Sequence, residues 1–145
     1  MIENKFDDLQ IKNILSKTKI IGLVGASDNP ERPSNIVMKY LQTRGYKVIP
    51  VNPTKVNMKI HNELCYSSLL HIPYSIDMVD VFRRSEECLE IAKQAIKIDA
   101  KVFWMQLNIF NKEAFNLVKK NNLQCIYNKC PKIEYSRIFN ELDNI

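Results

Sequence analysis

The residues with the clearest chemical potential stand in a loop that follows a short apolar run, IIGLVG, at residues 20–25. This loop and the segment after it combine small, cationic and hydroxyl residues: Gly25, Ala26, Ser27, Arg32, Pro33 and Ser34. Small residues let a phosphate approach backbone N–H groups, and a helix beginning at Pro33 would direct the positive end of its dipole toward that anion. The glycines alone are a weak signal, because GxGxxG is absent and Gly25 could simply end a strand. With Arg32 and Ser34 beside it, the loop predicts a phosphate-binding site.

A second loop, after the apolar run YKVIPV, carries Asn52, Pro53 and Lys55 and no acidic residue. Dinucleotide sites for NAD usually place Asp or Glu at this point, where the carboxylate accepts hydrogen bonds from the ribose hydroxyls. An acid would repel a phosphorylated ribose, whereas Lys55 would attract one. The loop therefore favours a ligand with a ribose phosphate, such as coenzyme A (CoA) or NADP. A solvated surface lysine is the alternative interpretation of Lys55.

Patterns typical of catalysis or metal binding are weak in this sequence. His61 and His71 lie in an irregular stretch, and neither has a Cys or His partner at metal-ligand spacing. We find no GxSxG elbow and no spacing that indicates a Ser-His-Asp triad. Cys130 is the one candidate nucleophile, since it follows an apolar run and stands beside Lys129, although it could equally be a small packing residue before Pro131. We expect no catalytic residues and no metal site.

The elements that must position these loops alternate between two hydrophobic periods. Short apolar runs typical of buried strands span residues 20–25, 46–51, 77–82, 101–105 and 123–127. Helical spacing separates them, with helices expected from Pro33 to Gly45, from Ser85, from the cap residue Asn111 and from about residue 132.

Two further segments complete the expected secondary structure. An amphipathic leading helix is expected within residues 1–18, and its apolar positions are Leu9, Ile11, Ile14 and Leu15. The helix after Pro33 has Ile36, Val37, Tyr40 and Leu41 at helical spacing. The stretch from Asn52 to Pro73 is irregular, with a short extended piece near Ile60 to Cys65.

Strands that alternate with helices imply right-handed crossovers and a parallel sheet covered on both faces. We therefore predict an α/β fold, a Rossmann-like three-layer sandwich with a five-stranded, mainly parallel sheet, as a single domain over residues 1–145. In such sheets, ligands bind beyond the carboxyl ends of the strands, at the point where the strand order reverses. Both loops described above follow strands, so they are expected to meet at this edge.

Composition and charge exclude several classes of function. The net charge of +5 comes from scattered lysines without an aromatic-interleaved stripe, which argues against nucleic-acid binding. No apolar run is long enough to span a bilayer, and the acidic N-terminal segment does not resemble a secretory signal. The four cysteines show no CxxC pair, so reduced thiols and a cytoplasmic location are expected.

Several motifs in the same order resemble those of a known family. They are GASDNPERPSNIVMKYLQTRGYKVIPVNP, DMVDVFRRSE, AKVFWMQL and NKCP, and the resemblance extends from about residue 18 to 140. The chain resembles the stand-alone CoA-binding proteins, which are small Rossmann relatives of the CoA-binding domain in the succinyl-CoA synthetase alpha chain. Asn108 stands where that family more often has glycine, and Asn128-Lys129 is a variant form.

The resemblance implies a role for each strand-end loop. The Gly25–Ser27 loop and the Arg32–Ser34 segment would hold the pyrophosphate of CoA, while Asn52, Pro53 and Lys55 would lie by the 3′-phosphate. Phe82 and Arg83 would flank the adenine or pantetheine path. The rest of the cleft would be lined by Met105, Gln106, Cys130 and Pro131.

We therefore expect a protein that binds CoA or an acyl-CoA without catalysing a reaction. One alternative is an enzyme, either an NADP-linked oxidoreductase or an acyltransferase subunit that needs a partner chain. Another is a regulatory module that senses acyl-CoA and acts through a protein partner, which the sequence does not identify. The missing acid in the second loop and the missing catalytic pattern argue against the enzymes.

Overall fold

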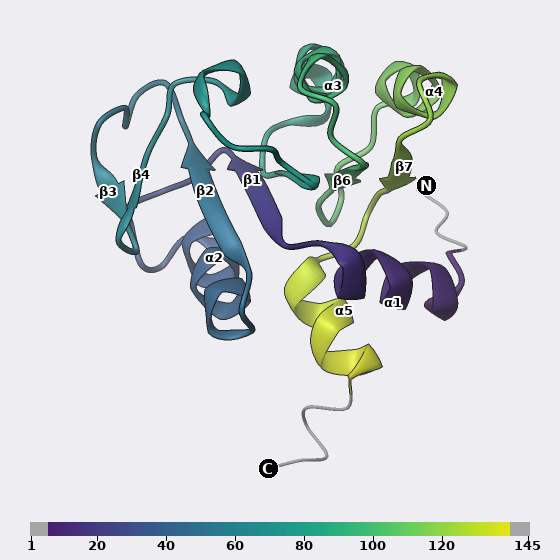
Figure 1. Ribbon diagram of the computed structural model, residues 1–145, viewed down its shortest axis with the longest axis horizontal. Coiled ribbons are helices and arrows are strands. Elements are labelled where there is room, and N and C mark those ends of the chain that lie inside the picture. The colour runs from purple at the N-terminus through teal and green to yellow at the C-terminus, as the bar shows by residue number, and fades with distance from the viewer. Residues whose placement is uncertain (1–5, 140–145) are drawn as a thin grey trace.

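Five parallel strands form the central sheet of this computed structural model, which describes residues 6–139 (Figure 1). In spatial order they are β2 (Lys47–Val51), β1 (Ile20–Val24), β5 (Met78–Val81), β6 (Val102–Met105) and β7 (Gln124–Ile126). Every neighbouring pair is parallel. The sheet grows from β1 toward β2 in one direction and through β5 toward β7 in the other, so the strand order reverses beside β1. The predicted Rossmann-like fold and its five strands are confirmed.

Helices cover both faces of this sheet (Figure 1). One face carries α1 (Asp8–Lys17), α2 (Pro33–Thr43) and α5 (Pro131–Ile138), and the other carries α3 (Cys88–Lys97) and α4 (Lys112–Lys120). Two buried clusters fill the spaces between these layers. The leading helix expected within residues 1–18 is α1. Residues 1–5 of that range lie outside the described residues.

The helix boundaries follow from local chemistry that the sequence indicates. Pro33 is the first residue of α2, where its missing N–H leaves no hydrogen bond unmade. The Asn111 side chain caps α4 by accepting from the Ala114 N–H at 2.9 Å. Beyond the end of α2, Gly45 has a φ of +96°, a conformation that favours glycine.

Tertiary packing changed the expected inner faces of two helices. Leu9 is 67% exposed and Ile36 is 45% exposed, although their spacing indicated burial. In α2 the buried aliphatic face instead comprises Val37, Met38 and Leu41. The helix is rotated about its axis so that these residues pack on β1 and β2. The helix expected from Ser85 begins with a 3₁₀ turn, Ser85–Glu87, before α3.

The irregular stretch after β2 contains a small hairpin in place of the single extended piece that we predicted. β3 (Lys59–Ile60) pairs antiparallel with β4 (Glu63–Leu64). The chain reverses between them at His61 and Asn62, whose φ angles are +46° and +73°. Asparagine tolerates this left-handed region, which explains how the chain turns within two residues.

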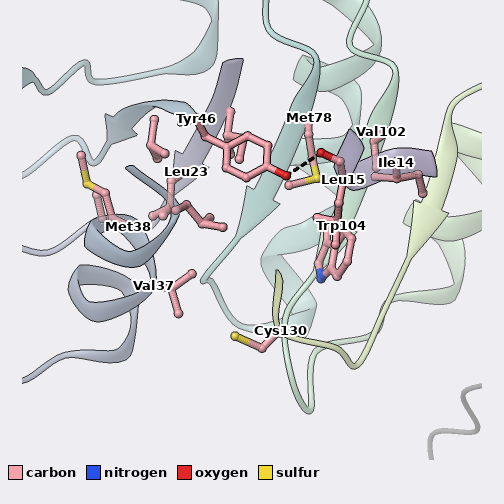
Figure 2. Close-up of a cluster of buried hydrophobic side chains, with 14 of the residues drawn as sticks. Ile14, Leu15, Leu23, Val37, Met38, Tyr46, Met78, Val102, Trp104 and Cys130 are labelled. Carbon is pink, nitrogen blue, oxygen red and sulfur yellow. Dashed lines mark hydrogen bonds between the residues drawn. The ribbon is translucent and has the colours of Figure 1, made fainter. Parts of the chain in front are cut away.

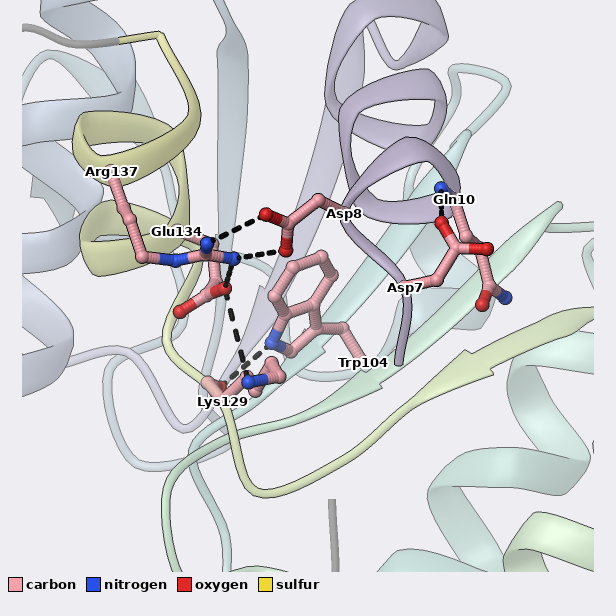
Figure 3. Close-up of polar contacts among 7 residues, drawn as sticks. All are labelled: Asp7, Asp8, Gln10, Trp104, Lys129, Glu134 and Arg137. Carbon is pink, nitrogen blue, oxygen red and sulfur yellow. Dashed lines mark hydrogen bonds and ion pairs between the residues drawn. The ribbon is translucent and has the colours of Figure 1, made fainter. Parts of the chain in front are cut away.

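Hydrogen bonds and an ion pair on the lower face in Figure 1 fix the position of α5. The Trp104 indole N–H donates to the Lys129 carbonyl at 2.8 Å, and Arg137 bonds both Asp8 at 2.8 Å and Glu134 at 2.7 Å (Figure 3). These bonds tie α5 to α1 and to the buried strand β6. Figure 2 shows Cys130, which precedes α5, at the edge of the same buried cluster as Trp104. These contacts with β6 and α1 therefore fix α5 and the segment that connects it to β7.

Candidate ligand-binding site

A cradle of about 380 Å³ lies at the carboxyl edge of the sheet, where the strand order reverses. Its lining comes from the ends of three neighbouring strands and the start of α2: Gly25, Ala26, Ser27, Arg32, Pro33, Ser34, Asn52, Phe82 and Arg83. All of these residues were site candidates from the sequence. The sheet topology brings them together because parallel strands end at the same edge.

The backbone at Gly25 is constrained from two sides. Its φ is +91°, and a Cβ at this position would lie 2.3 Å from the Phe82 carbonyl oxygen. Gly25 and Ala26 both donate their N–H groups to the Val51 carbonyl, at 2.9 and 3.2 Å. Glycine is therefore required here by close backbone packing, and these two N–H groups are already bonded within the protein.

Unlike the amides of Gly25 and Ala26, the backbone N–H groups at the start of α2 are available to an anion in the cradle. The first-turn amides of a helix have no intrahelical acceptor, and Ser34 and Asn35 occupy that turn. The Asn35 side chain donates to the Ser27 carbonyl at 2.8 Å, which joins the loop to the helix. Arg32, the residue before the helix, is exposed, and the described residues provide it with no carboxylate partner. The helix dipole and this guanidinium make the cradle electropositive.

Asn52 connects the two strand-end loops. Its side-chain amide donates to the Ala26 carbonyl at 2.8 Å, and its oxygen accepts from the Thr54 N–H at 2.9 Å. Lys55 lies near the rim, where its Nζ is 3.4 Å from an Asp28 carboxylate oxygen. The second loop thus contributes a structural amide to the cradle and a paired cation beside it.

A larger apolar groove of about 620 Å³ continues from the cradle. The two depressions share Pro33, Phe82 and Arg83. Beyond these residues, the groove passes between α2 and α5, and its further lining comprises Ile36, Val37, Arg84, Gln106, Leu107, Ile109, Cys130, Lys132 and Ile133. A ligand with a charged part in the cradle can therefore extend an uncharged part into the groove.

Three polar side chains lie at or beneath the inner wall of the groove. Gln106 and Cys130 line it, and Asp80 is fully buried behind them on β5. Within residues 6–139, the two carboxyl oxygens of Asp80 have no hydrogen-bond partner. The Oε1 of Gln106 has none there either. Burial raises the pKa of Asp80 well above its ordinary value. Burial also raises the pKa of the Cys130 thiol, although hydrogen bonds from the Ile133 amide and from Gln106 oppose the shift.

Arg83 stands where the cradle and the groove meet. Its guanidinium donates to Glu87 at 2.6 Å, and Arg84 donates to the same carboxylate at 3.3 Å. These hydrogen bonds, that from Arg83 above all, lower the pKa of Glu87. Glu87 was not among the candidate site residues, although its spacing of four from Arg83 suits an ion pair.

Four residues proposed from the resemblance lie outside both depressions, and Lys55 near the rim is one of them. Met105 is buried in the core on the α3 and α4 side of the sheet, because alternate residues of a strand face opposite sides. Pro131 is buried as the first residue of α5. Pro53 lines a separate depression of about 390 Å³ near α3.

Asn108 has a φ of +64°, and its N–H donates to the Asn128 side chain at 2.7 Å. This left-handed conformation is one that glycine and asparagine both adopt, so the substitution preserves the loop. Asn128 itself has a φ of +55°. The variant residues therefore hold the loops after β6 and β7 together.

The histidines do not face the cradle or the groove. His61 Nε2 lies 2.7 Å from the Asn35 side-chain oxygen, and His71 Nδ1 lies 2.9 Å from the Ser67 hydroxyl. In residues 6–139, no group of His, Cys, Asp and Glu side chains is arranged to hold a metal ion. No helix within that range is long and apolar enough to cross a membrane.

A Rossmann-like sheet with an electropositive cradle at its switch point defines a nucleotide-binding α/β protein. The chain belongs to the CoA binding domain family, whose model matches residues 19–136. The resemblance stated from the sequence is thereby confirmed.

Similar proteins match along nearly the whole chain. The uncharacterized protein YneT of Bacillus subtilis (strain 168) is 40% identical over 130 residues, which are 88% of this chain and 93% of that protein. A hypothetical protein from Pyrococcus horikoshii OT3 has the same fold, with a TM-score of 0.89 and 41% identity, over 96% of this chain and 99% of the other. A Thermus thermophilus structure matches with a TM-score of 0.89 and 28% identity, over 92% and 100% of the two chains.

Proposed function

We propose that this protein binds CoA, or a CoA thioester, at the carboxyl edge of its sheet without catalysing a reaction. The observation that carries the proposal is the continuity of an electropositive cradle with an apolar groove through Pro33, Phe82 and Arg83. CoA joins an anionic pyrophosphate to a long uncharged pantetheine arm, so its two parts match the two depressions. Membership of the CoA binding domain family supports the same ligand.

In this proposal, the pyrophosphate lies against the first turn of α2. Ser34 and Asn35 offer backbone N–H groups there, and Arg32 supplies a charge that the described residues leave unpaired. Lys55 would exchange its partner Asp28 for the 3′-phosphate of the ribose. The pantetheine arm would enter the groove, where the side chain of Gln106, whose Oε1 is buried without a partner, would rotate to bond an amide of the arm.

A non-catalytic role is supported by the state of the titratable groups near the groove. The raised pKa of Cys130 keeps its sulfur in the thiol form, which is a poor nucleophile. Asp80 is fully buried behind the lining, so it does not contact a ligand in the groove. His61 is bonded to the Asn35 side chain and His71 to the Ser67 hydroxyl, and neither histidine lines the cradle or the groove.

Isothermal titration with CoA, dephospho-CoA, NAD and NADP tests the proposal. We expect CoA to bind with micromolar or tighter affinity and NAD to bind at least about tenfold more weakly, a difference of about 1.4 kcal/mol. NAD or NADP binding more tightly than CoA would overturn the assignment.

A variant pair locates the pyrophosphate. Arg32→Ala should weaken CoA and dephospho-CoA alike, by about tenfold or more, because a charge-assisted contact contributes on the order of 1.5–3 kcal/mol. Lys101→Ala is the matched control, since Lys101 is an exposed cation at the opposite edge of the sheet. Equal losses in both variants would indicate only a general effect of net charge.

A further inference from the structure

Three aliphatic side chains are exposed among the residues that line the groove. Ile36 on α2, Leu107 after β6 and Ile133 on α5 are 45%, 48% and 50% exposed, and all three line the same groove. They approach it from three different elements, so the sheet and two helices together form the apolar rim. Single exposed aliphatic residues are ordinary, but several around one concave site indicate a ligand or partner.

The position of this rim relative to the charges identifies the kind of ligand. Arg83 lies at the junction with the cradle, whereas Ile133 and Leu107 are not part of the cradle lining. A molecule anchored by its phosphates in the cradle therefore reaches these two aliphatic residues only in the groove, whose lining also includes the cations Arg84 and Lys132. Such an order matches a ligand whose far end is hydrocarbon.

The inner wall of the groove carries two polar side chains, Gln106 and Cys130. Gln106 lines the groove with an unpartnered, buried Oε1, and Cys130 lies beside it. A rotation of the Gln106 side chain would present its amide group to an amide near the end of a pantetheine arm. Apart from the cations Arg83, Arg84 and Lys132, the remaining lining is apolar, with Val37 and Ile109 in addition to the rim residues, and this surface suits an acyl chain better than a further polar group.

We propose that the groove between α2 and α5 holds the acyl chain of a CoA thioester, and that the protein prefers acyl-CoA with an aliphatic chain over free CoA. This inference rests on the proposed binding of CoA in the cradle. It adds the class of ligand, an unbranched or branched hydrocarbon acyl group, and assigns Ile36, Leu107 and Ile133 as the residues that recognise it.

A chain-length series tests this inference by titration calorimetry. CoA, acetyl-CoA, butyryl-CoA, hexanoyl-CoA and octanoyl-CoA are compared below the concentration at which the longer ones form micelles. Each methylene that becomes buried should tighten binding about three- to fourfold, until the chain extends past the rim. A flat series with measurable CoA binding would overturn the inference and leave CoA binding intact, whereas no binding of CoA itself would overturn the proposed function.

Matched variants place the chain on this rim. Ile133→Ser and Ile36→Ser should each reduce the gain in affinity per methylene, and both residues are exposed enough for the fold to tolerate the change. Leu9→Ser is the control, because Leu9 is an exposed helical leucine that lies outside the groove, and its gain per methylene should equal that of the wild type. An unchanged gain in both isoleucine variants would overturn the assignment of the chain to this groove.

Discussion

Arg83 and Glu87 form an ion pair of 2.6 Å at the junction of the cradle and the groove. Glu87 also accepts from Arg84, so one carboxylate pairs with two cations that border the site and offsets part of their charge. A phosphate that approaches Arg83 must compete with this carboxylate. The pair therefore lowers the attraction of the site for anions, although it also fixes the direction of the Arg83 side chain.

Replacing Glu87 should strengthen anion binding. Glu87→Gln removes the competing charge, and we expect CoA to bind about two- to fivefold more tightly at low ionic strength, because exposed ion pairs are worth up to about 1 kcal/mol. The gain should shrink at high salt. Calorimetry at two salt concentrations measures it, with Glu113→Gln on α4 as the control. Weaker binding would indicate that Glu87 positions Arg83 for the ligand.

Lys55 provides a test of the 3′-phosphate assignment. Its ammonium lies 3.4 Å from Asp28 and is partly exposed, so we expect Lys55→Ala to weaken CoA binding by about five- to tenfold. Dephospho-CoA lacks the 3′-phosphate and should lose little affinity. The ratio of the two dissociation constants is the readout, with Lys59→Ala for comparison. Equal losses for both ligands would place Lys55 elsewhere.

Asp80 should make the stability of the protein depend on pH. Its folded-state pKa is raised by burial, so the folded state holds this proton more tightly than the unfolded state does. The contribution is fully present below the ordinary pKa near 3.8 and is lost as pH rises toward the folded-state pKa, by at most about 1.4 kcal/mol per pH unit. Asp80→Asn removes this loss.

Urea denaturation across neutral and acidic pH measures the effect. The free energy of unfolding of the wild type should fall relative to Asp80→Asn as pH increases. Asp99→Asn serves as the control, since Asp99 is exposed and its left-handed φ of +57° suits asparagine. Parallel profiles for the wild type and Asp80→Asn would show that Asp80 is not protonated in the folded state.

Cys130 should be the first cysteine to react with a thiol reagent, although slowly. It is the cysteine that lines the groove, and burial raises its pKa. Cys88 on α3 and Cys125 on β7 are buried in the cluster on the other face of the sheet, and their pKa values are raised to about 12. Treatment with CoA disulfide and peptide mapping should find the adduct at Cys130, with free CoA slowing its formation. An adduct first at Cys65 would contradict this.

Two glycines with similar φ angles separate conformation from close packing. A Cβ on Gly45 meets nothing within 4 Å, whereas one on Gly25 would collide with the Phe82 carbonyl. Gly45→Ala should therefore cost about 1–2 kcal/mol, the price of a left-handed alanine, and Gly25→Ala clearly more. Thermal and urea unfolding compare the two. Equal losses would mean that the backbone at Gly25 relaxes freely.

Local patterns in the sequence determined the secondary structure of this protein. The five apolar runs became the five strands of the central sheet, because short apolar runs between helical patterns are typical of buried strands. Pro33 and Asn111 placed two helix starts, because their effects act within one turn of the chain. The alternation of the elements then fixed the sheet edge at which the candidate site lies.

Only the tertiary structure decided which side chains face that site. Met105 and Gln106 are adjacent in sequence, yet the first is in the core and the second lines the groove, since the strand ends between them. Ile36 was expected inside and lies on the groove rim, because packing on the sheet sets the rotation of α2. Such facts depend on contacts between segments far apart in the chain, which no local pattern contains.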